Sequence, residues 1–163
     1  MTRYKQPVSV LVVIFTAAPS TDPSTELGAG FEVLLLERAD YPNYWQSVTG
    51  SCEPGEVPRD TALREVGEET GLDAAQYALS DWQLQNVYEI YPHWRHRYPP
   101  GITHNTEHVF GLQLPHPAAI RLASREHLNF QWLAWQDAAQ KVFSPSNRAA
   151  ILELPARANR KMP

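Results

Sequence analysis

The most constraining feature of this sequence is a short helix predicted to carry three glutamates on one face. Pro58 suits the first position of a helix, and the apolar spacing after it predicts a helix over residues 58–70. Glu65, Glu68 and Glu69 are then spaced i, i+3 and i+4, so we expect their carboxylates to project from the same side. Like charges at this spacing destabilise a helix unless the face is fully solvated or a cation binds there.

The distribution of charge favours a cation over a solvated face. Arg64 can pair with Glu68 at i+4, but one guanidinium does not neutralise three acids. Residues 50–72 hold six acidic and two basic side chains, whereas the other 140 residues carry twelve of each. The net charge of −4 therefore arises in this one segment, which indicates a local cation site. Mg²⁺ typically takes one or two carboxylates together with substrate phosphates.

Length and composition predict one folded domain over residues 1–163. With 43% hydrophobic residues, a chain of this length can bury a substantial core. The only cysteine, Cys52, excludes an internal disulfide and a multi-cysteine zinc site, and a free thiol indicates a reducing compartment, so we expect a cytoplasmic protein. The apolar run 8–15 is too short to span a bilayer. The negative net charge and the lack of a basic stripe do not favour nucleic-acid binding.

Strand and helix patterns alternate along the chain. Ser144 and Pro145 predict the N-cap and first position of a second helix, ahead of residues 147–154. A loop is expected over 17–30, and a basic tail over about 156–163. Strands interleaved with helices predict an α/β fold in which helices cover a mixed sheet. The expected strands are 7–16, 31–37, 84–91, 106–114 and 130–135.

A fixed pattern of residues runs through the acidic segment. Nine positions define it: Gly50, Glu56, Arg64, Glu65, Val66, Glu68, Glu69, Gly71 and Leu72. With this spacing the segment resembles the Nudix box at every specified position. The resemblance implies a Nudix-type αβα sandwich, with a mixed β-sheet flanked by helices and a loop–helix–loop box over residues 50–72. It also implies a hydrolase that cleaves a nucleoside diphosphate linked to a further moiety, with Mg²⁺ as cofactor and Mn²⁺ as a substitute.

The same resemblance assigns the chemistry of the box. It places metal ligation on Glu65 and Glu69, with Glu68 close by, and it implies that Arg64 orients a box carboxylate. These four residues are the expected catalytic group. Family members often take one more carboxylate from outside the box, and the matching residue here is Glu126. Clustered carboxylates and metal suit phosphoanhydride hydrolysis, because phosphate charge must be neutralised and a water positioned for attack.

Three further box residues are expected to serve structure. Glu56 is expected to brace the loop before the helix. Gly50 and Gly71 are expected to adopt backbone conformations that a side chain would disfavour, since glycine lacks a Cβ.

Segments outside the box resemble bacterial members of the family that act on a pterin triphosphate in folate biosynthesis. The matching blocks are 4–13, 44–51, 96–98, 100–101, 105–107, 126–128 and 146–148. The departures, at 17–30 and 74–81, are expected to be surface insertions. The resemblance implies hydrolysis of 7,8-dihydroneopterin 3′-triphosphate to the monophosphate and pyrophosphate. It places these residues around the substrate: Lys5, Arg38, Thr49, Tyr88, Glu89, Ile90, Tyr91 and Ser144.

Two flanking features have two interpretations each. Trp45, just before the box, can stack on a pterin ring or pack in the core. The segment 93–98 gathers two arginines and two histidines beside aromatic residues, so it can bind a triphosphate or form a solvated loop.

Other functions follow from the same pattern. One is a nucleotide-cleansing pyrophosphohydrolase for a substrate such as dATP or oxidised dGTP, because pterins and purines are both bicyclic amino-oxo heterocycles. Another is a non-catalytic module that senses a nucleotide. Such modules commonly lose box glutamates, whereas this chain keeps all of them. The expected partner is thus a small-molecule pterin or nucleoside triphosphate, without nucleic acid or membrane.

Overall fold

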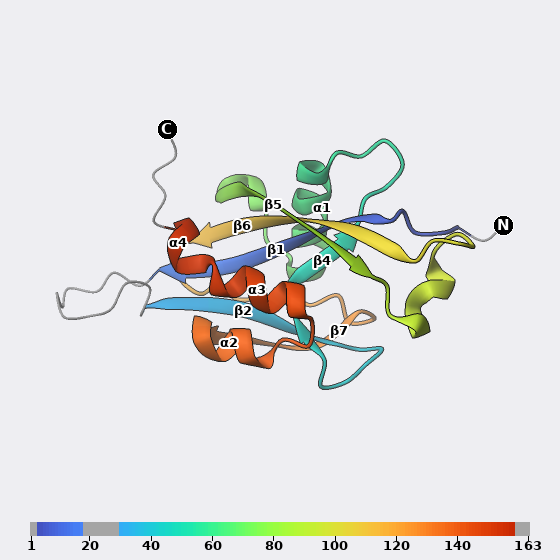
Figure 1. Cartoon of the computed structure of the whole chain (residues 1–163). Coiled ribbons are helices and arrows are strands. Elements are labelled where there is room, and N and C mark those ends of the chain that lie inside the picture. The colour runs from blue at the N-terminus through green and yellow to red at the C-terminus, as the bar shows by residue number, and fades with distance from the viewer. Residues whose placement is uncertain (1–2, 18–29, 159–163) are drawn as a thin grey trace.

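In the part of the chain that the computed structural model describes, residues 3–17 and 30–158, seven strands form one mixed sheet (Figure 1). The strands are β1 (Val8–Ala17), β2 (Phe31–Arg38), β3 (Trp45–Gln46), β4 (Val48–Ser51), β5 (Ala78–Glu89), β6 (His104–Leu114) and β7 (His127–Ala134). Their order is β3-β2-β1-β6-β5, and β4 pairs with β1 while β7 pairs with β2. β1 and β6 are parallel, and the other pairs are antiparallel.

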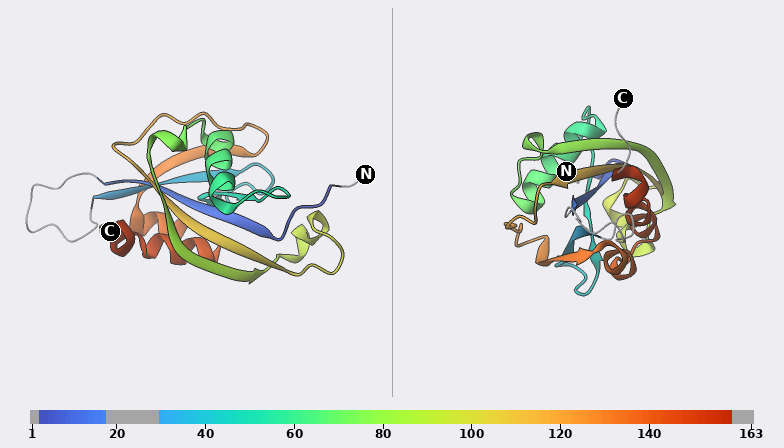
Figure 2. Two further views of the ribbon diagram at one scale, coloured as in Figure 1. Left: turned by 90° about the horizontal axis from the view of Figure 1, so that it is seen from above. Right: turned by 90° about the vertical axis from the view of Figure 1, so that its left-hand side faces the viewer.

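Helices cover both faces of this sheet. The α-helices are α1 (Pro58–Thr70), α2 (Trp135–Lys141), α3 (Pro145–Leu152) and α4 (Leu154–Ala158), and short 3₁₀ helices are η1 (Ala74–Gln76) and η2 (Pro92–Arg97). Figure 2 shows α1 on one side of the sheet and α2, α3 and α4 on the other. The predicted αβα sandwich with a mixed sheet is therefore confirmed.

β1 supplies both halves of the core. Leu11 and Val13 pack on the side of α2 and α3, whereas Val10 and Val12 pack on the side of α1. Successive side chains of a strand point to opposite faces, so a strand covered on both faces is apolar without alternation. This is the physical reason for the unbroken apolar run near the start of the sequence.

Most predicted elements are confirmed, with small shifts in their ends. The helix over 58–70 is α1, and Ser144 caps α3 by accepting a hydrogen bond from the backbone N–H of Asn147. The prediction that 74–81 is a surface insertion is wrong in part, because this segment contains η1 and the start of β5, where Leu79 is buried. A bulge between Asp81 and Leu84 interrupts the alternation of the strand there, so the residue pattern does not indicate one continuous strand.

Two predicted segments lie partly outside the described residues. Of the loop over 17–30, only the two ends are described, and residues 159–163 of the basic tail are not. The described start of that tail belongs to α4, where Arg157 donates hydrogen bonds to the Glu153 carboxylate at 2.8 Å and to the Trp82 carbonyl at 2.6 Å. Among the described helices, none has the length and apolarity to cross a membrane.

Gly67 is expected to be a site where a larger residue stabilises the protein. It lies exposed inside α1, and a Cβ there would meet only the Leu72 carbonyl oxygen, at 3.7 Å. We expect Gly67→Ala to raise the free energy of unfolding by about 0.5–1 kcal/mol and Tm by about 2 °C, because alanine loses less backbone entropy in a helix. Thermal and urea unfolding measure the change.

The matched control is Gly111→Ala. A Cβ at Gly111 would lie 2.5 Å from the Trp82 ring, so this substitution is expected to lower Tm. A fall in Tm for Gly67→Ala would contradict the prediction.

Candidate active site

The glutamates of α1 face different surroundings. Glu69 is 2% exposed and lies on the same side of α1 as the buried Ala62 and Val66. The side chain of Glu65 is 12% exposed, whereas that of Glu68 is 55% exposed. Arg64 Nη1 contacts both Glu65, at 2.7 Å, and Glu68, at 3.3 Å, so these two carboxylates lie beside each other as the spacing predicts. Glu68 differs from the other two glutamates in being exposed and outside the cavity lining.

Arg64 joins the loop before α1 to the helix. Its guanidinium donates to both carboxylate oxygens of Glu56, at 2.8 and 3.0 Å, and to the Ser51 carbonyl at 3.1 Å. It also donates to Glu65 at 2.7 Å and to Glu68 at 3.3 Å. The guanidinium therefore holds Glu65 at a defined position relative to the loop.

Glycine is needed at the two box positions, Gly50 and Gly71, for different structural reasons. Gly71 ends α1 with a φ of 75°, in the left-handed region, as predicted. Gly50 has no such φ, so the expected reason for this glycine is wrong. A Cβ on Gly50 would lie 2.1 Å from the Glu65 carboxyl carbon, and glycine is required there because the carboxylate packs directly on the backbone.

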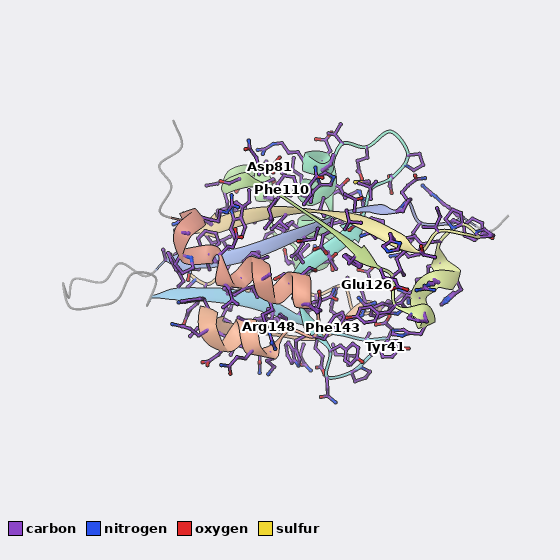
Figure 3. The ribbon with its side chains drawn as sticks, in the orientation of Figure 1. Tyr41, Asp81, Phe110, Glu126, Phe143 and Arg148 are labelled. Atoms are coloured by element: carbon purple, nitrogen blue, oxygen red, sulfur yellow. The ribbon has the colours of Figure 1, made fainter. Side chains whose placement is uncertain are left out.

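A cavity of about 560 Å³ opens in front of these glutamates. Most of the predicted site residues line it: Lys5, Arg38, Thr49, Gly50, Glu65, Glu69, Tyr88, Glu89, Ile90, Tyr91, Glu126 and Ser144. The predicted residues that do not line it are Glu56, Arg64, Glu68 and Gly71. Segments far apart in the sequence meet here, and two of the lining residues, Glu126 and Phe143, are labelled in Figure 3.

Three side chains form a candidate metal cluster at one wall of the cavity. Ligand atoms of Glu69, Glu126 and His127 all lie within 4.8 Å of one another. His127 is buried, and its Nε2 lies 3.3 Å from Glu69 Oε1. No local pattern in the sequence marks His127 as a site residue, although it directly follows Glu126. Its burial at the start of β7, which pairs with β2, is a tertiary feature.

The electrostatics of this cluster fit a cation. Burial raises the pKa of Glu69 well above its usual value, and the negative charges of Glu65 and Glu126 raise it further. Burial and the positive charge of Arg38 lower the pKa of His127 to about 4, so its imidazole is neutral at neutral pH. Glu69 Oε2 and His127 Nδ1 are buried without hydrogen-bond partners among the described residues. A divalent cation would offset the repulsion between the carboxylates, and it would bind the Glu69 Oε2 atom that lacks a partner.

Cations form another part of the cavity lining. Asp40 accepts hydrogen bonds from Arg38 at 2.7 and 2.8 Å and from Arg97 at 3.0 Å. The hydrogen bonds from Arg38, and after them that from Arg97, lower the pKa of Asp40 to about 2. Burial and the charge of Arg97 lower the pKa of Lys5. Lys5, Arg38 and Arg97 therefore lie near one another in the cavity lining, and such a group of cations suits the oxygens of a polyphosphate.

Aromatic side chains complete the cavity. Tyr91, Trp94 and Phe143 line it, and the rings of Trp94 and Phe143 pack edge to face with centroids 5.9 Å apart.

The structure decides both interpretations that the sequence left open. Trp45 does not line the cavity; it is 9% exposed and packs in the core, so it does not stack on a ligand. The segment 93–98 places Trp94, Arg97 and Tyr98 in the cavity lining, so it is not simply a solvated loop.

Comparisons with known proteins agree with this geometry. The model of the NUDIX domain matches residues 5–154. The chain is 47% identical over 150 residues to the dihydroneopterin triphosphate diphosphatase of Escherichia coli K12, covering 91% of each chain. It is 39% identical over 153 residues to the Haemophilus influenzae protein of that name, covering 93% of this chain and 89% of the relative. The solved E. coli dihydroneopterin triphosphate pyrophosphohydrolase has 45% identity and a TM-score of 0.79, covering 94% and 97% of the two chains.

The contact between Arg64 and Glu56 predicts a contribution to acid stability. The Arg64 hydrogen bonds lower the pKa of Glu56 to about 2, from about 4.5. Because the folded-state pKa is depressed, the contribution is complete above about pH 4.5 and is lost as the pH falls toward 2. We expect Glu56→Gln to unfold more easily at pH 7, and to lose less stability than wild type between pH 4.5 and 2. Urea unfolding across this range measures both; parallel pH profiles would contradict the prediction.

Proposed function

This chain belongs to the NUDIX domain family, and we propose that it hydrolyses 7,8-dihydroneopterin 3′-triphosphate to dihydroneopterin monophosphate and pyrophosphate, a step of folate biosynthesis. The observation that carries this proposal is one cavity of about 560 Å³ that holds a buried acidic cluster and a group of cations. Its volume falls in the range of small-molecule sites, so a pterin triphosphate is a suitable occupant. The free thiol of Cys52 is compatible with a cytoplasmic enzyme.

Metal binding is assigned to Glu65, Glu69 and Glu126. NUDIX hydrolases use a divalent metal, and we take it to be Mg²⁺, with Mn²⁺ as a substitute, because the ligands are carboxylate oxygens. When bound, the cation neutralises charge on the phosphate oxygens and lowers the pKa of a bound water. The Nε2 of His127, next to Glu69 Oε1, orients that carboxylate.

Binding of the substrate phosphates is assigned to Lys5 and Arg38, with Thr49 and Ser144 beside them in the same cavity lining. In the net reaction the oxygen of a water forms a bond to phosphorus, and a phosphoanhydride bond breaks to release pyrophosphate.

Arg64 does not line the cavity, so we assign it the positioning of Glu65 through their 2.7 Å hydrogen bond. Glu68 remains a predicted catalytic residue, although it is exposed outside the cavity lining.

Binding of the pterin ring is assigned to residues at the end of β5 and directly after it. Tyr88, Glu89, Ile90 and Tyr91 all line the cavity, and Tyr91 belongs to the aromatic group with Trp94. A flat pterin ring gains stacking and dispersion energy against such side chains.

Glu69→Gln is expected to lower kcat by at least about 100-fold, since it removes a charged metal ligand. The fold should persist with an equal or higher Tm in EDTA, because Glu69 is 2% exposed and its burial disfavours the charged form. Mg²⁺ should raise the Tm of wild type by mass action and have little effect on the variant. Turnover and thermal unfolding with Mg²⁺ or EDTA measure these effects. Unchanged kcat would remove Glu69 from the metal site.

Substrate preference tests the function itself. We expect kcat/KM for dihydroneopterin triphosphate to exceed that for dATP, dGTP and GTP by at least about tenfold, or about 1.4 kcal/mol of transition-state discrimination. Pyrophosphate release in the presence of Mg²⁺ provides the assay. Parity, or a preference for a nucleotide, would indicate a nucleotide-cleansing enzyme with the same chemistry.

A further inference from the structure

A second acidic residue lines the cavity away from the box. Glu107 lies on β6, where it pairs with Ser9 of the parallel strand β1 and with Asn86 of β5. It is 4% exposed, yet it contributes to the cavity lining. Like Ser9, it therefore belongs to the floor that the sheet forms beneath the cavity.

The described contacts of the Glu107 carboxylate come from uncharged polar groups. Its carboxylate accepts a hydrogen bond from the hydroxyl of Ser146, and a long one of 3.5 Å from Asn86 Nδ2. Among the described residues no Lys, Arg or His forms an ion pair with it. A buried carboxylate without a cation is costly, and two bonds leave part of its capacity as an acceptor unused. The cavity is the direction from which further donors can come.

Neighbouring groups hold this part of the cavity in place. Asn105, two residues before Glu107 on β6, donates to Ser9 Oγ at 2.7 Å and to the Tyr88 hydroxyl at 3.1 Å. Asn147 of α3 bonds Ser47 through both its side-chain oxygen, at 2.8 Å, and its Nδ2, at 2.9 Å. The first pair of bonds joins β6 to β1 and β5, and the second fixes α3, which carries Ser146, so the polar groups near Glu107 are held in place before a ligand enters.

A carboxylate in such a position selects ligands that present two parallel N–H donors. The 2-amino-4-oxo edge of a pterin presents a ring N–H beside an exocyclic amino group, and guanine presents the same pair. Adenine instead presents a donor beside an acceptor, which places an electron pair against the carboxylate. Resting on the proposed function, we infer that Glu107 is the specificity-determining residue that accepts both N–H groups of the 2-amino-4-oxo edge.

The substitution Glu107→Gln tests this role, because an amide replaces one acceptor by a donor at nearly unchanged volume. The measurement is kcat/KM for dihydroneopterin triphosphate, dGTP and dATP in wild type and variant, with Tm as a check of the fold. We expect the pterin/dATP and dGTP/dATP ratios each to fall at least about tenfold, the size of a good bidentate contact. Activity on dATP should be retained or rise, since an amide can pair with adenine.

The control is the same change at a carboxylate away from the cavity. Glu153 pairs with Arg157 at 2.8 Å beside α4, and Glu153→Gln should leave both ratios unchanged. Equal losses on all three substrates in Glu107→Gln would show a structural role and overturn the inference. A fall for the pterin with a constant dGTP/dATP ratio would also overturn it, because Glu107 would then bind the side-chain hydroxyls of the pterin substrate.

A second measurement needs no variant and is independent of turnover of the pterin triphosphate. Lumazine has a carbonyl at C2 in place of the amino group of pterin, together with a hydrogen on N1. We expect pterin to inhibit dGTP hydrolysis by wild type at least about tenfold more strongly than lumazine, because a carbonyl would face the carboxylate. Equal inhibition would overturn the inference. If wild type hydrolyses only nucleotides, the proposed function fails, but the dGTP/dATP ratio and this inhibition still test Glu107.

Discussion

The guanidinium of Arg64 is the contact on which the acidic site depends. It links Glu56 and the Ser51 carbonyl, in the loop before α1, to Glu65 on the helix itself. A planar group with several N–H donors can satisfy these acceptors at once, which the ammonium of lysine cannot do with the same geometry. The loop–helix unit therefore presents Glu65 and Glu69 to the cavity in a defined arrangement. Without this bracing, the like charges would favour separation of the two carboxylates.

The cavity concentrates unfavourable groups that a ligand or metal can compensate. Glu69 is buried beside two other carboxylates, Glu107 is buried and forms no ion pair with any described cation, and Lys5 lies close to Arg97. Each of these arrangements costs stability in the protein alone. Each also matches part of a complex between a cation and a pterin triphosphate. The same residues thus destabilise the fold locally and prepare it for binding.

Parts of the site followed from sequence because the chemistry is local. The spacing of Arg64, Glu65 and Glu69 on one helix, and the left-handed turn at Gly71, depend only on neighbours along the chain. Other parts did not follow. Trp45 belongs to the core, and Glu68 points to solvent, because the packing of β3 and of α1 against the sheet decides their surroundings. The local residue pattern does not determine which side of a strand or helix will face a cavity.

The sequence by itself determined the helix that carries the box, because this depends on residue types at fixed short spacings, and the resemblance carried by the same pattern indicated the family and its αβα fold. The tertiary structure alone brought His127 and Glu107 to the cavity. Both are buried on strands whose neighbours are distant in sequence, through the pairing of β7 with β2 and of β6 with β1. Burial of a polar side chain beside a cavity is a property of the packed sheet, and it exists only when these distant strands have come together.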